Sequence, residues 1–268
     1  MKKILWLTDT HLTFSFLWKK YSLIKYLKNI GADALFLSGD ISNGFFIDYI
    51  IYYLANHLNI PIYFVLGNHD YYFKNISNIH NDLKFLTKKY ENLHWLTEND
   101  VLELKPNICV IGSEGWYDCN YDDINYLKLN LDLKFIRDFR KIKKYEQKFQ
   151  TLKDMANNSA NLIEKKLLNA LNLGYKQIYL ITHIPPFKEA TKDEGTILES
   201  FWLPYNANSI LGEKIKNIMV NFPDRKLTIL CGHTHDRVTI NINNNIECKT
   251  NSANYFNLGF KNKEIILI

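Results

Sequence analysis

Short runs of apolar residues recur along the chain, and polar residues follow them closely. Each run is five or six residues long and rich in β-branched or aromatic side chains, and most runs stop at a Gly, Asp, Thr or His. A short apolar run bounded by turn residues is typical of a strand that is buried on both faces of a sheet. We therefore predict buried strands at 3–7, 34–38, 62–66, 108–112, 177–182 and 227–232.

Segments with the apolar spacing of helices lie between the first three of these strands. Apolar residues recur there every three to four positions, and Gly31 follows the first group as an expected helix C-cap, while Pro61 begins the strand after the second group. The two groups are Leu17, Tyr21, Ile24 and Leu27, then Ile47, Ile50, Ile51 and Leu54. Alternating strands and helices predict an α/β domain with a largely parallel core.

The middle of the chain has a different pattern. No convincing strand is predicted from 118 to 173, whereas Phe135, Phe139, Ile142 and Phe149 have the spacing of an amphipathic helix. A second helix is predicted over 162–171, ended by Gly174, and strands return at 237–242, 246–250 and 264–268. Neither a repeat nor a linker divides the chain. We therefore expect a single domain over 1–268 that includes a helical insertion at about 118–173.

Composition narrows the class of protein. The chain has 268 residues, 47% of them hydrophobic, and a net charge of +5, too small an excess to indicate nucleic-acid binding by itself. Its four cysteines lack CxxC spacing, which favours a reducing compartment. The first apolar stretch is too short for a signal sequence, and no run reaches the length of a membrane span. We expect a cytoplasmic protein with no membrane contact.

Carboxylates, imidazoles and one amide lie at the ends of the predicted strands. Carboxyl ends of parallel strands meet at one edge of a sheet, so these side chains should converge. Five of the eight histidines are among them. The residues are Asp9, His11, Asp40, Asn68, His69, Asp70, His183, His233 and His235.

Together these groups suit divalent ions such as Mn, Fe or Zn. There are more donors than one ion needs, so two ions are expected, with Asp40 as the shared ligand. The glycines at 39, 67 and 232 precede several of these side chains, and we expect them to allow sharp turns of the backbone.

The ordered blocks "DTH", "GDISN", "GNHD", "TH" and "GHTH" resemble the calcineurin-like metallophosphoesterases, which are binuclear-metal hydrolases of phosphate esters. The resemblance implies two mixed β-sheets packed as a sandwich and flanked by helices. It also implies two sets of metal ligands that share one aspartate. The first set is Asp9, His11, Asp40 and His235, and the second is Asp40, Asn68, His183 and His233.

The same resemblance assigns roles to the remaining residues of "GNHD". His69 matches a histidine that protonates or stabilises the leaving oxygen, and Asp70 matches the acid that orients it. With two ions in place, a bridging hydroxide would attack phosphorus in line. We expect Asn68, His69 and Trp116 to contact the substrate, Trp116 by stacking on a ring, although ordinary packing explains Trp116 and Tyr117 equally well.

Three functions are consistent with these residues. The first is hydrolysis of a small phosphodiester or nucleotide-like substrate. The second is a nuclease that holds nucleic acid with the basic stretch at 134–153, although a solvated helix face is the simpler interpretation of that stretch. The third is a non-catalytic interaction protein, whose expected sign, loss of His69 or of several ligands, is absent. The segment "SNGF" at 42–45 and Leu66 before "GNHD" lack the arginines that protein serine/threonine phosphatases of the family carry beside these blocks, which argues against a protein phosphatase. No pattern indicates an oligomeric state.

Overall fold

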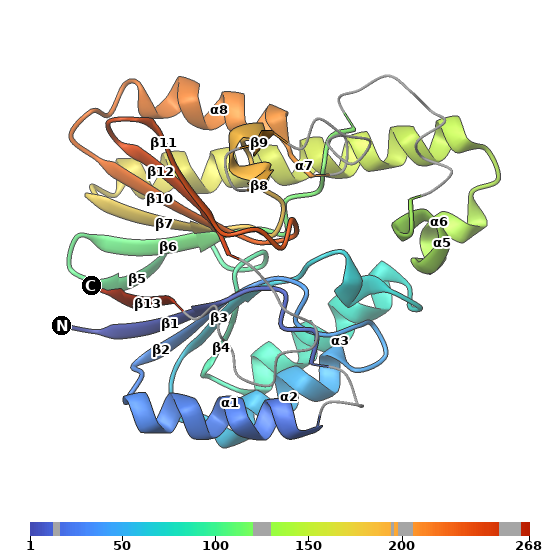
Figure 1. The fold of residues 1–268 in the computed structure, drawn as a ribbon, viewed down its shortest axis with the longest axis horizontal. Helices are drawn as coiled ribbons and strands as arrows, with labels where there is room; N and C mark the ends of the chain where they lie inside the picture. The colour runs from blue at the N-terminus through green and yellow to red at the C-terminus, as the bar shows by residue number, and fades with distance from the viewer. Residues whose placement is uncertain (13–16, 120–129, 194–195, 198–205, 252–263) are drawn as a thin grey trace.

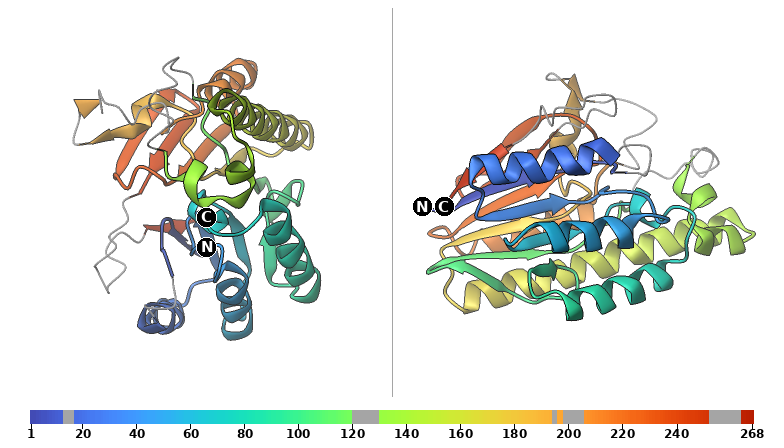
Figure 2. Two further views of the ribbon diagram at one scale, coloured as in Figure 1. Left: turned by 90° about the vertical axis from the view of Figure 1, so that its right-hand side faces the viewer. Right: turned by 90° about the horizontal axis from the view of Figure 1, so that it is seen from below.

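The computed structural model describes residues 1–12, 17–119, 130–193, 196–197, 206–251 and 264–268. Two large β-sheets lie face to face, and helices cover the outer face of each sheet (Figure 1). Figure 2 shows the same layers from the side and from below. The sandwich of two mixed sheets flanked by helices, expected from the sequence, is confirmed.

The first sheet has five strands in the order β13-β1-β2-β3-β4. All neighbours are parallel except β13, which pairs antiparallel with β1 at the edge. Its strands are β1 (Lys3–Leu7), β2 (Ala34–Ser38), β3 (Ile62–Val65), β4 (Leu93–Trp95) and β13 (Glu264–Leu267).

The second sheet has six strands in the order β11-β12-β10-β7-β6-β5. Its centre is parallel, and β5 and β11 add antiparallel edges. Its strands are β5 (Leu102–Lys105), β6 (Ile108–Gly112), β7 (Gln177–Ile181), β10 (Lys226–Cys231), β11 (Val238–Asn243) and β12 (Ile246–Thr250). A separate pair consists of β8 (Lys192–Asp193) and β9 (Thr196–Ile197).

Helices α1, α2 and α3 cover the first sheet, and α7 and α8 cover the second (Figures 1 and 2). The helices of these layers are α1 (Leu17–Ile30), α2 (Ile47–His57), α3 (Ile76–Lys89), α7 (Tyr145–Asn172) and α8 (Ser209–Met219). Two short helices, α5 (Asp132–Phe135) and α6 (Arg137–Lys141), lie beyond the sheets, and two 3₁₀ turns, η2 (His69–Tyr71) and η3 (Lys188–Thr191), follow strand ends. No helix in the described ranges is both long and apolar enough to cross a membrane.

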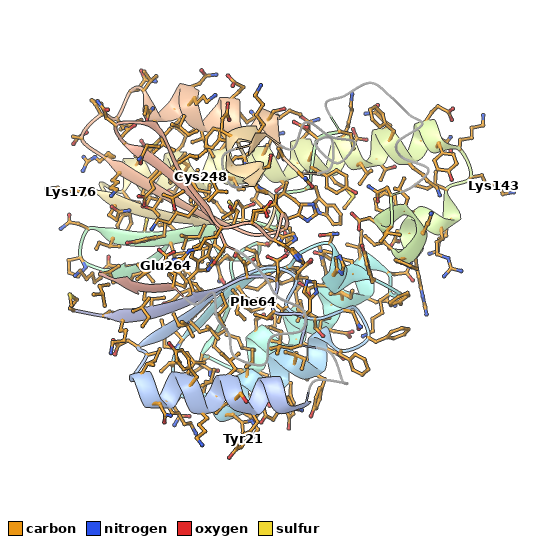
Figure 3. The ribbon with its side chains drawn as sticks, in the orientation of Figure 1. Tyr21, Phe64, Lys143, Lys176, Cys248 and Glu264 are labelled. Carbon is orange, nitrogen blue, oxygen red and sulfur yellow. The ribbon has the colours of Figure 1, made fainter. Side chains whose placement is uncertain are left out.

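Alternation along β1 explains why its apolar run is continuous. Leu5 and Leu7 pack into the layer between the first sheet and its helices, while Ile4 and Trp6 pack into the layer between the two sheets. Successive side chains of a strand point to opposite faces, so a strand covered on both faces needs apolar residues throughout. In Figure 3 the side chain of Phe64, on β3, lies inside the molecule, whereas Tyr21, on α1, lies at its surface.

The predicted strands are confirmed, with bounds within one residue of those expected. The strands β4 and β5 and the helices α3 and α8 were not predicted. The strand β4 is only three residues long, and β5, which reads "LELK", is a partly exposed edge with a single buried residue. Such segments carry little hydrophobic pattern, so their place in the sheets depends on neighbouring strands.

The predicted helix ends at Gly31 and Gly174 are confirmed. Both glycines have positive φ, +60° and +86°, and the next residue donates its N–H to a carbonyl five residues back. These are the hydrogen bonds of Schellman caps, in which a left-handed residue ends the helix.

The helical insertion differs from the single amphipathic helix expected over 135–149. Helices α5 and α6 are separate there, because Ile136 and Ile142 have extended backbone, and the long α7 begins at Tyr145 and includes the helix expected over 162–171. Residues 120–129 of the insertion lie outside the described ranges. The division of the chain into domains stays a prediction.

Candidate metal centre

Five strands of both sheets deliver the predicted ligands to one end of the molecule. In Figure 1 these strands end on the right, the side on which α5 and α6 lie. Asp9 and His11 follow β1, Asp40 follows β2, and Asn68 follows β3. From the second sheet, His183 follows β7, and His233 and His235 follow β10. The convergence expected from the sequence is therefore present in the structure.

The backbone of most of these residues is left-handed. Positive φ values of about 40° to 70° are uncommon outside glycine and are kept only where surrounding contacts hold them. Here the N–H of His11 donates to the carbonyl of Asp40 at 3.0 Å, which ties the ends of β1 and β2 together. The values are Asp9 48°, His11 42°, Asp40 48°, His233 71° and His235 60°. The left-handed backbone, rather than strand alternation alone, brings Asp9 and His11 to one site. It does the same for His233 and His235.

The first cluster contains Asp9, His11, Asp40 and His235. One donor atom from each of these residues lies within 4.8 Å of the others. His235 Nε2 is 3.3 Å from Asp9 Oδ1, and His11 Nε2 is 3.9 Å from Asp40 Oδ2. Two carboxylates and two imidazoles at this spacing form a ligand set for a divalent ion.

The second cluster contains Asp40, Asn68, His183 and His233. Asn68 Oδ1 lies 3.1 Å from His183 Nε2 and 3.1 Å from His233 Nδ1. His183 Nε2 is also 3.4 Å from Asp40 Oδ1. The other ring nitrogen of His183, Nδ1, lies 2.9 Å from the carbonyl of Ser38. That contact orients the ring and leaves Nε2 directed at the cluster, as is usual for a metal-binding histidine.

Asp40 connects the two clusters. Its Oδ2 faces His11, and its Oδ1 faces His183 and accepts a hydrogen bond from the backbone N–H of His69 at 2.9 Å. The side chain is 1% exposed. A carboxylate with one oxygen toward each donor set is the geometry needed for a shared ligand.

Missing Cβ atoms make room for these side chains. A Cβ on Gly67 would lie 2.2 Å from Asp40 Oδ1, and a Cβ on Gly232 would lie 2.2 Å from Asp9 Oδ2. Gly39 combines a positive φ of 92° with a close approach to the His183 ring. The sequence predicted glycines for sharp turns; at Gly67 and Gly232 the need is space, since neither has a positive φ.

Burial controls the ionisation of Asp40 and of two histidines. It raises the pKa of Asp40 well above its ordinary value, and the charges of Asp9 and Asp70 raise it further. Burial also lowers the pKa of His11 and of His183, each to about 3. These imidazoles are therefore neutral and able to donate electron pairs to a cation.

Asp9 and His235 behave as a pair. Burial raises the pKa of Asp9, but the hydrogen bond from His235 and the nearby imidazoles outweigh it and hold that pKa below its ordinary value. Burial lowers the pKa of His235, and the hydrogen bond with Asp9 outweighs that effect and raises it. Thr8 Oγ1 and the N–H of His233 also donate to the Asp9 carboxylate, at 2.6 and 3.1 Å. The donor set fits divalent cations, because a cation would favour the ionised form of both buried carboxylates and accept electron pairs from the neutral rings of His11 and His183.

His69 lies at the edge of both clusters and belongs to neither. Its Nε2 is 3.8 Å from Asp40 Oδ2, and its side chain is 31% exposed. The ring stacks on Tyr72 with centroids 4.3 Å apart. Burial lowers the pKa of His69 to about 4. A partly exposed imidazole beside the ligands is placed to meet a substrate, and this role stays a prediction.

Asp70 has other partners than the His69 ring. Its carboxylate accepts hydrogen bonds from the backbone N–H groups of Ile41, Ser42 and Gly67, at 3.2, 2.7 and 2.9 Å. The side chain is fully buried, and these amides use its acceptor capacity. Asp70 thereby fixes the loops after β2 and β3, and the catalytic role expected for it stays a prediction.

Trp116 and Tyr117 are largely inside the molecule. Trp116 is 8% exposed and packs against Tyr71, and Tyr117 is fully buried with its ring 6.3 Å from that of His233. Little of the Trp116 ring is available for stacking on a substrate. The packing interpretation is the one these contacts support, and substrate contact by Trp116 stays a prediction.

One residue near the site was missed by sequence reasoning. Asp132, at the start of α5, accepts hydrogen bonds from Asn68 and from Tyr72. An aspartate beside a basic stretch has no pattern that marks it, because its partners are about sixty residues away in the chain.

The basic stretch at 134–153 is largely exposed. Phe139 is buried beneath it, and Phe135 and Phe149 are partly buried against the same core. Figure 3 places Lys143 at the far end of the molecule from Lys176. The exposed basic residues of this stretch include Lys134, Arg137, Arg140, Lys141, Lys143 and Lys144. Exposed charge over buried phenylalanines agrees with the simpler interpretation of a solvated surface, although two short helices and the link to α7 form it rather than one helix face.

Comparison with known proteins adds a family and a fold. The family model described as calcineurin-like phosphoesterase matches residues 2–237. No curated protein matches the sequence.

Solved structures with a similar fold cover nearly the whole chain. A protein from Thermus thermophilus has a TM-score of 0.57 at 12% identity, covering 96% of this chain and 90% of its own. A dimetal phosphatase from Danio rerio has a TM-score of 0.57 at 12% identity, and the match covers 94% of this chain and 87% of the phosphatase. Phosphopantetheinyl hydrolase from Mycobacterium tuberculosis has a TM-score of 0.56 at 11% identity, and the match covers 93% of this chain and 88% of the hydrolase. At these identities the likeness concerns the fold alone.

Proposed function

We propose that this chain, which belongs to the calcineurin-like phosphoesterase family, hydrolyses a small phosphodiester or nucleotide-like substrate at a site for two divalent ions. The observation that carries the proposal is Asp40, which directs one carboxylate oxygen toward each of two clusters of donors, most of them buried. The first ion would be held by Asp9, His11, Asp40 and His235. The second would be held by Asp40, Asn68, His183 and His233.

Bound there, two ions would lower the pKa of a water molecule and neutralise phosphate charge. The residues of the chain then have separate tasks. Asn68 and the four histidine ligands would hold the ions, and the ring of His69, at the rim of the site, would donate an N–H to the leaving oxygen. Asp70 holds the loops that carry Asp40 and Asn68 at a constant separation.

Donor chemistry restricts the metal without selecting one. Imidazole nitrogen, carboxylate oxygen and amide oxygen together suit Mn, Fe and Zn, and availability often decides among them. Mn is our working choice for experiments.

A substrate panel tests the proposal. Phosphomonoesters, phosphodiesters and nucleotides are assayed with chelator-treated protein to which Mn²⁺, Zn²⁺ or Fe²⁺ has been returned. We expect turnover of small phosphodiesters or nucleotides that disappears on chelation and returns with the metal. Negligible hydrolysis of every compound, nitrophenyl phosphates included, with Mn²⁺ bound would favour the non-catalytic interaction protein instead.

A nuclease is the second candidate, and the exposed basic residues of the insertion favour it. If Lys141, Lys143 and Lys144 neutralise phosphates, affinity for single- or double-stranded nucleic acid should fall steeply with salt. Replacing these three lysines by alanine should then reduce the slope of log affinity against log salt by about 2–3. If nucleic-acid binding is too weak to measure even at low salt, the nuclease is excluded and hydrolysis of a small substrate stays the proposed function.

The chain is further proposed to be one domain over 1–268 and cytoplasmic. Its four cysteines are buried and free, as is usual in a reducing compartment.

A further inference from the structure

The carboxylate of Asp132 accepts hydrogen bonds from three side chains in or beside the metal centre. Asp132 is 4% exposed and belongs to α5 of the helical insertion. Its Oδ1 accepts from Asn68 Nδ2 at 2.8 Å and from the Tyr72 hydroxyl at 2.7 Å, and its Oδ2 accepts from the Tyr117 hydroxyl at 2.7 Å. None of these three partners lies in α5. The carboxylate therefore connects the insertion to the segments that follow β3 and β6.

The bond to Asn68 decides which end of the amide faces the histidines. Asp132 Oδ1 accepts from Asn68 Nδ2, so the amide nitrogen of Asn68 lies on the Asp132 side. The amide oxygen then points the other way, 3.1 Å from His183 Nε2 and 3.1 Å from His233 Nδ1. Without Asp132 the amide could rotate and present N–H groups, which cannot bind a cation.

A second path runs from Asp132 to His69 through Tyr72. The Tyr72 ring stacks on the His69 ring at 4.3 Å with an interplanar angle of 26°, while its hydroxyl is held by Asp132. Burial and the neighbouring carboxylate raise the pKa of Tyr72, so its hydroxyl stays a donor. The position of the His69 ring therefore depends on the same carboxylate.

The insertion is also attached to this region by contacts that do not involve Asp132. The N–H of Phe73 donates to the carbonyl of Phe135 at 2.8 Å. Asp138, on α6, accepts from the N–H of Ile76 at the start of α3 at 2.8 Å. Asp138 is thus a carboxylate of the same insertion whose hydrogen bonds go to α3 and its N-cap rather than to a proposed ligand, which makes it a matched control.

We propose that Asp132 is a positioning residue of the metal centre, holding the Asn68 oxygen toward one of the two ions and the His69 ring beside them. The inference rests on the proposed two-ion site. The insertion then contributes to metal binding as well as packing against the core, because the Asp132 carboxylate holds the Asn68 oxygen in the donor set of one ion.

The test is a titration of Mn²⁺ into chelator-treated protein. We expect the wild type to bind two ions per chain, and Asp132→Ala to bind one of them about 10- to 100-fold more weakly while the other is unchanged. Asp138→Ala should bind both ions like the wild type. Asp132→Asn, whose amide oxygen can still accept from Asn68 Nδ2, should recover much of the lost affinity.

A double-mutant cycle separates positioning from a general structural effect. In an Asn68→Ala background, Asp132→Ala should weaken Mn²⁺ binding no further, because the group it positions is gone. Additive losses would overturn the proposal. If Asp132→Ala lacks a cooperative melting transition, Asp132→Leu, which keeps bulk without an acceptor, is measured in its place.

The Tyr72 path has its own readout. Tyr72→Phe keeps the stacked ring but loses the bond to Asp132, so kcat should fall several-fold with both Mn²⁺ affinities and KM nearly unchanged. If the wild type binds two ions and Asp132→Ala binds both equally well, the inference about Asp132 is overturned and the proposed function is not. A wild type that binds no Mn²⁺ would overturn the metal centre and the proposed function together.

Discussion

At the scale of single residues, the site depends on backbone conformations that most residues avoid. Five of the proposed ligands have positive φ, and glycines stand where a Cβ would collide with Asp9 or Asp40. Such strain persists only where surrounding contacts over-determine it. Two residues therefore allow sharp tests: His69, which lies outside both donor sets, and Gly67, which has no side chain at all.

His69→Ala should lower kcat by about 10²- to 10⁴-fold and leave the metal content nearly intact. The ring lies 3.8 Å from Asp40 Oδ2 at a partly exposed position, and neither cluster needs it as a donor. Kinetics on the best substrate of the panel and elemental analysis of the same sample measure the two effects. His57→Ala, an exposed histidine on α2, is the control and should change neither. Loss of metal in His69→Ala would make His69 a ligand instead.

Gly67→Ala should reduce metal binding and cost about 1–3 kcal/mol of stability. Its Cβ would lie 2.2 Å from Asp40 Oδ1 and 2.5 Å from the Asp40 backbone nitrogen, so the shared carboxylate must move. Gly31→Ala is the control, because Gly31 has a positive φ but no atom within 4 Å of an added Cβ. It should cost on the order of 1 kcal/mol and leave the metal stoichiometry unchanged. Mn²⁺ titration of both variants measures metal binding, and urea unfolding measures stability.

At the scale of elements, α7 is anchored to the strand ends by a buried charge. Lys166 Nζ donates to the carbonyls of Leu96, Thr97 and Gly112, at 2.6, 3.0 and 2.9 Å. Burial lowers the pKa of Lys166 from 10.5 to about 8. The ammonium group satisfies three carbonyls and loses hydration in doing so.

Lys166 predicts a pH dependence of stability. Between pH 8 and 10.5 the unfolded chain holds the lysine proton more tightly than the folded chain, so Lys166 contributes a rise in the free energy of unfolding with pH. The buried thiols of Cys109 and Cys119, whose pKa values burial raises to about 12, contribute a fall above pH 9, so the lysine contribution is measured as the difference between wild type and Lys166→Met. The contribution across that window is on the order of 3 kcal/mol. Urea unfolding of metal-free protein at about pH 7.5, 9 and 10.5 measures it. Lys166→Met should lack this rise, whereas Lys165→Met, at the exposed neighbouring position, should keep it. Equal slopes in the two variants would contradict the assignment.

At the scale of the whole molecule, the candidate metal centre joins the two sheets. Asp9, Asp40 and Asn68 come from the first sheet, and the three histidines after β7 and β10 come from the second. Each proposed ion would have ligands from both sheets. Metal binding should therefore oppose separation of the two halves of the sandwich.

Loading with Mn²⁺ should raise the melting temperature. At a free concentration about one hundred times Kd, a single site contributes about 2.7 kcal/mol, or about 5–10 °C for a chain of this size. Calorimetry with chelator and then with Mn²⁺ measures the shift. Asp40→Asn, which removes the shared carboxylate, should lose most of it. A melting temperature that does not respond to Mn²⁺ in the wild type would exclude ions that bridge the sheets.

The sequence alone determined most of the strands, the layers and the identity of the donors. Each buried strand is a continuous apolar run with a polar residue after it, and that local pattern is sufficient to place Asp9, Asp40 and His183 at strand ends. The order of the blocks also indicated the family, which the match over residues 2–237 confirms. Short edge strands and the breaks between α5, α6 and α7 carried no comparable pattern.

Only the tertiary structure decided how these residues meet. The partners of Asp70 are backbone amides, Trp116 packs into the core, and Asp132 reaches Asn68 across 64 positions of sequence. Such contacts leave no periodic trace, because a hydrogen bond between distant segments depends on the folded path of the chain and not on spacing. Hydrophobic periodicity reports which face of an element is buried; it does not report which polar group a buried carboxylate will meet there.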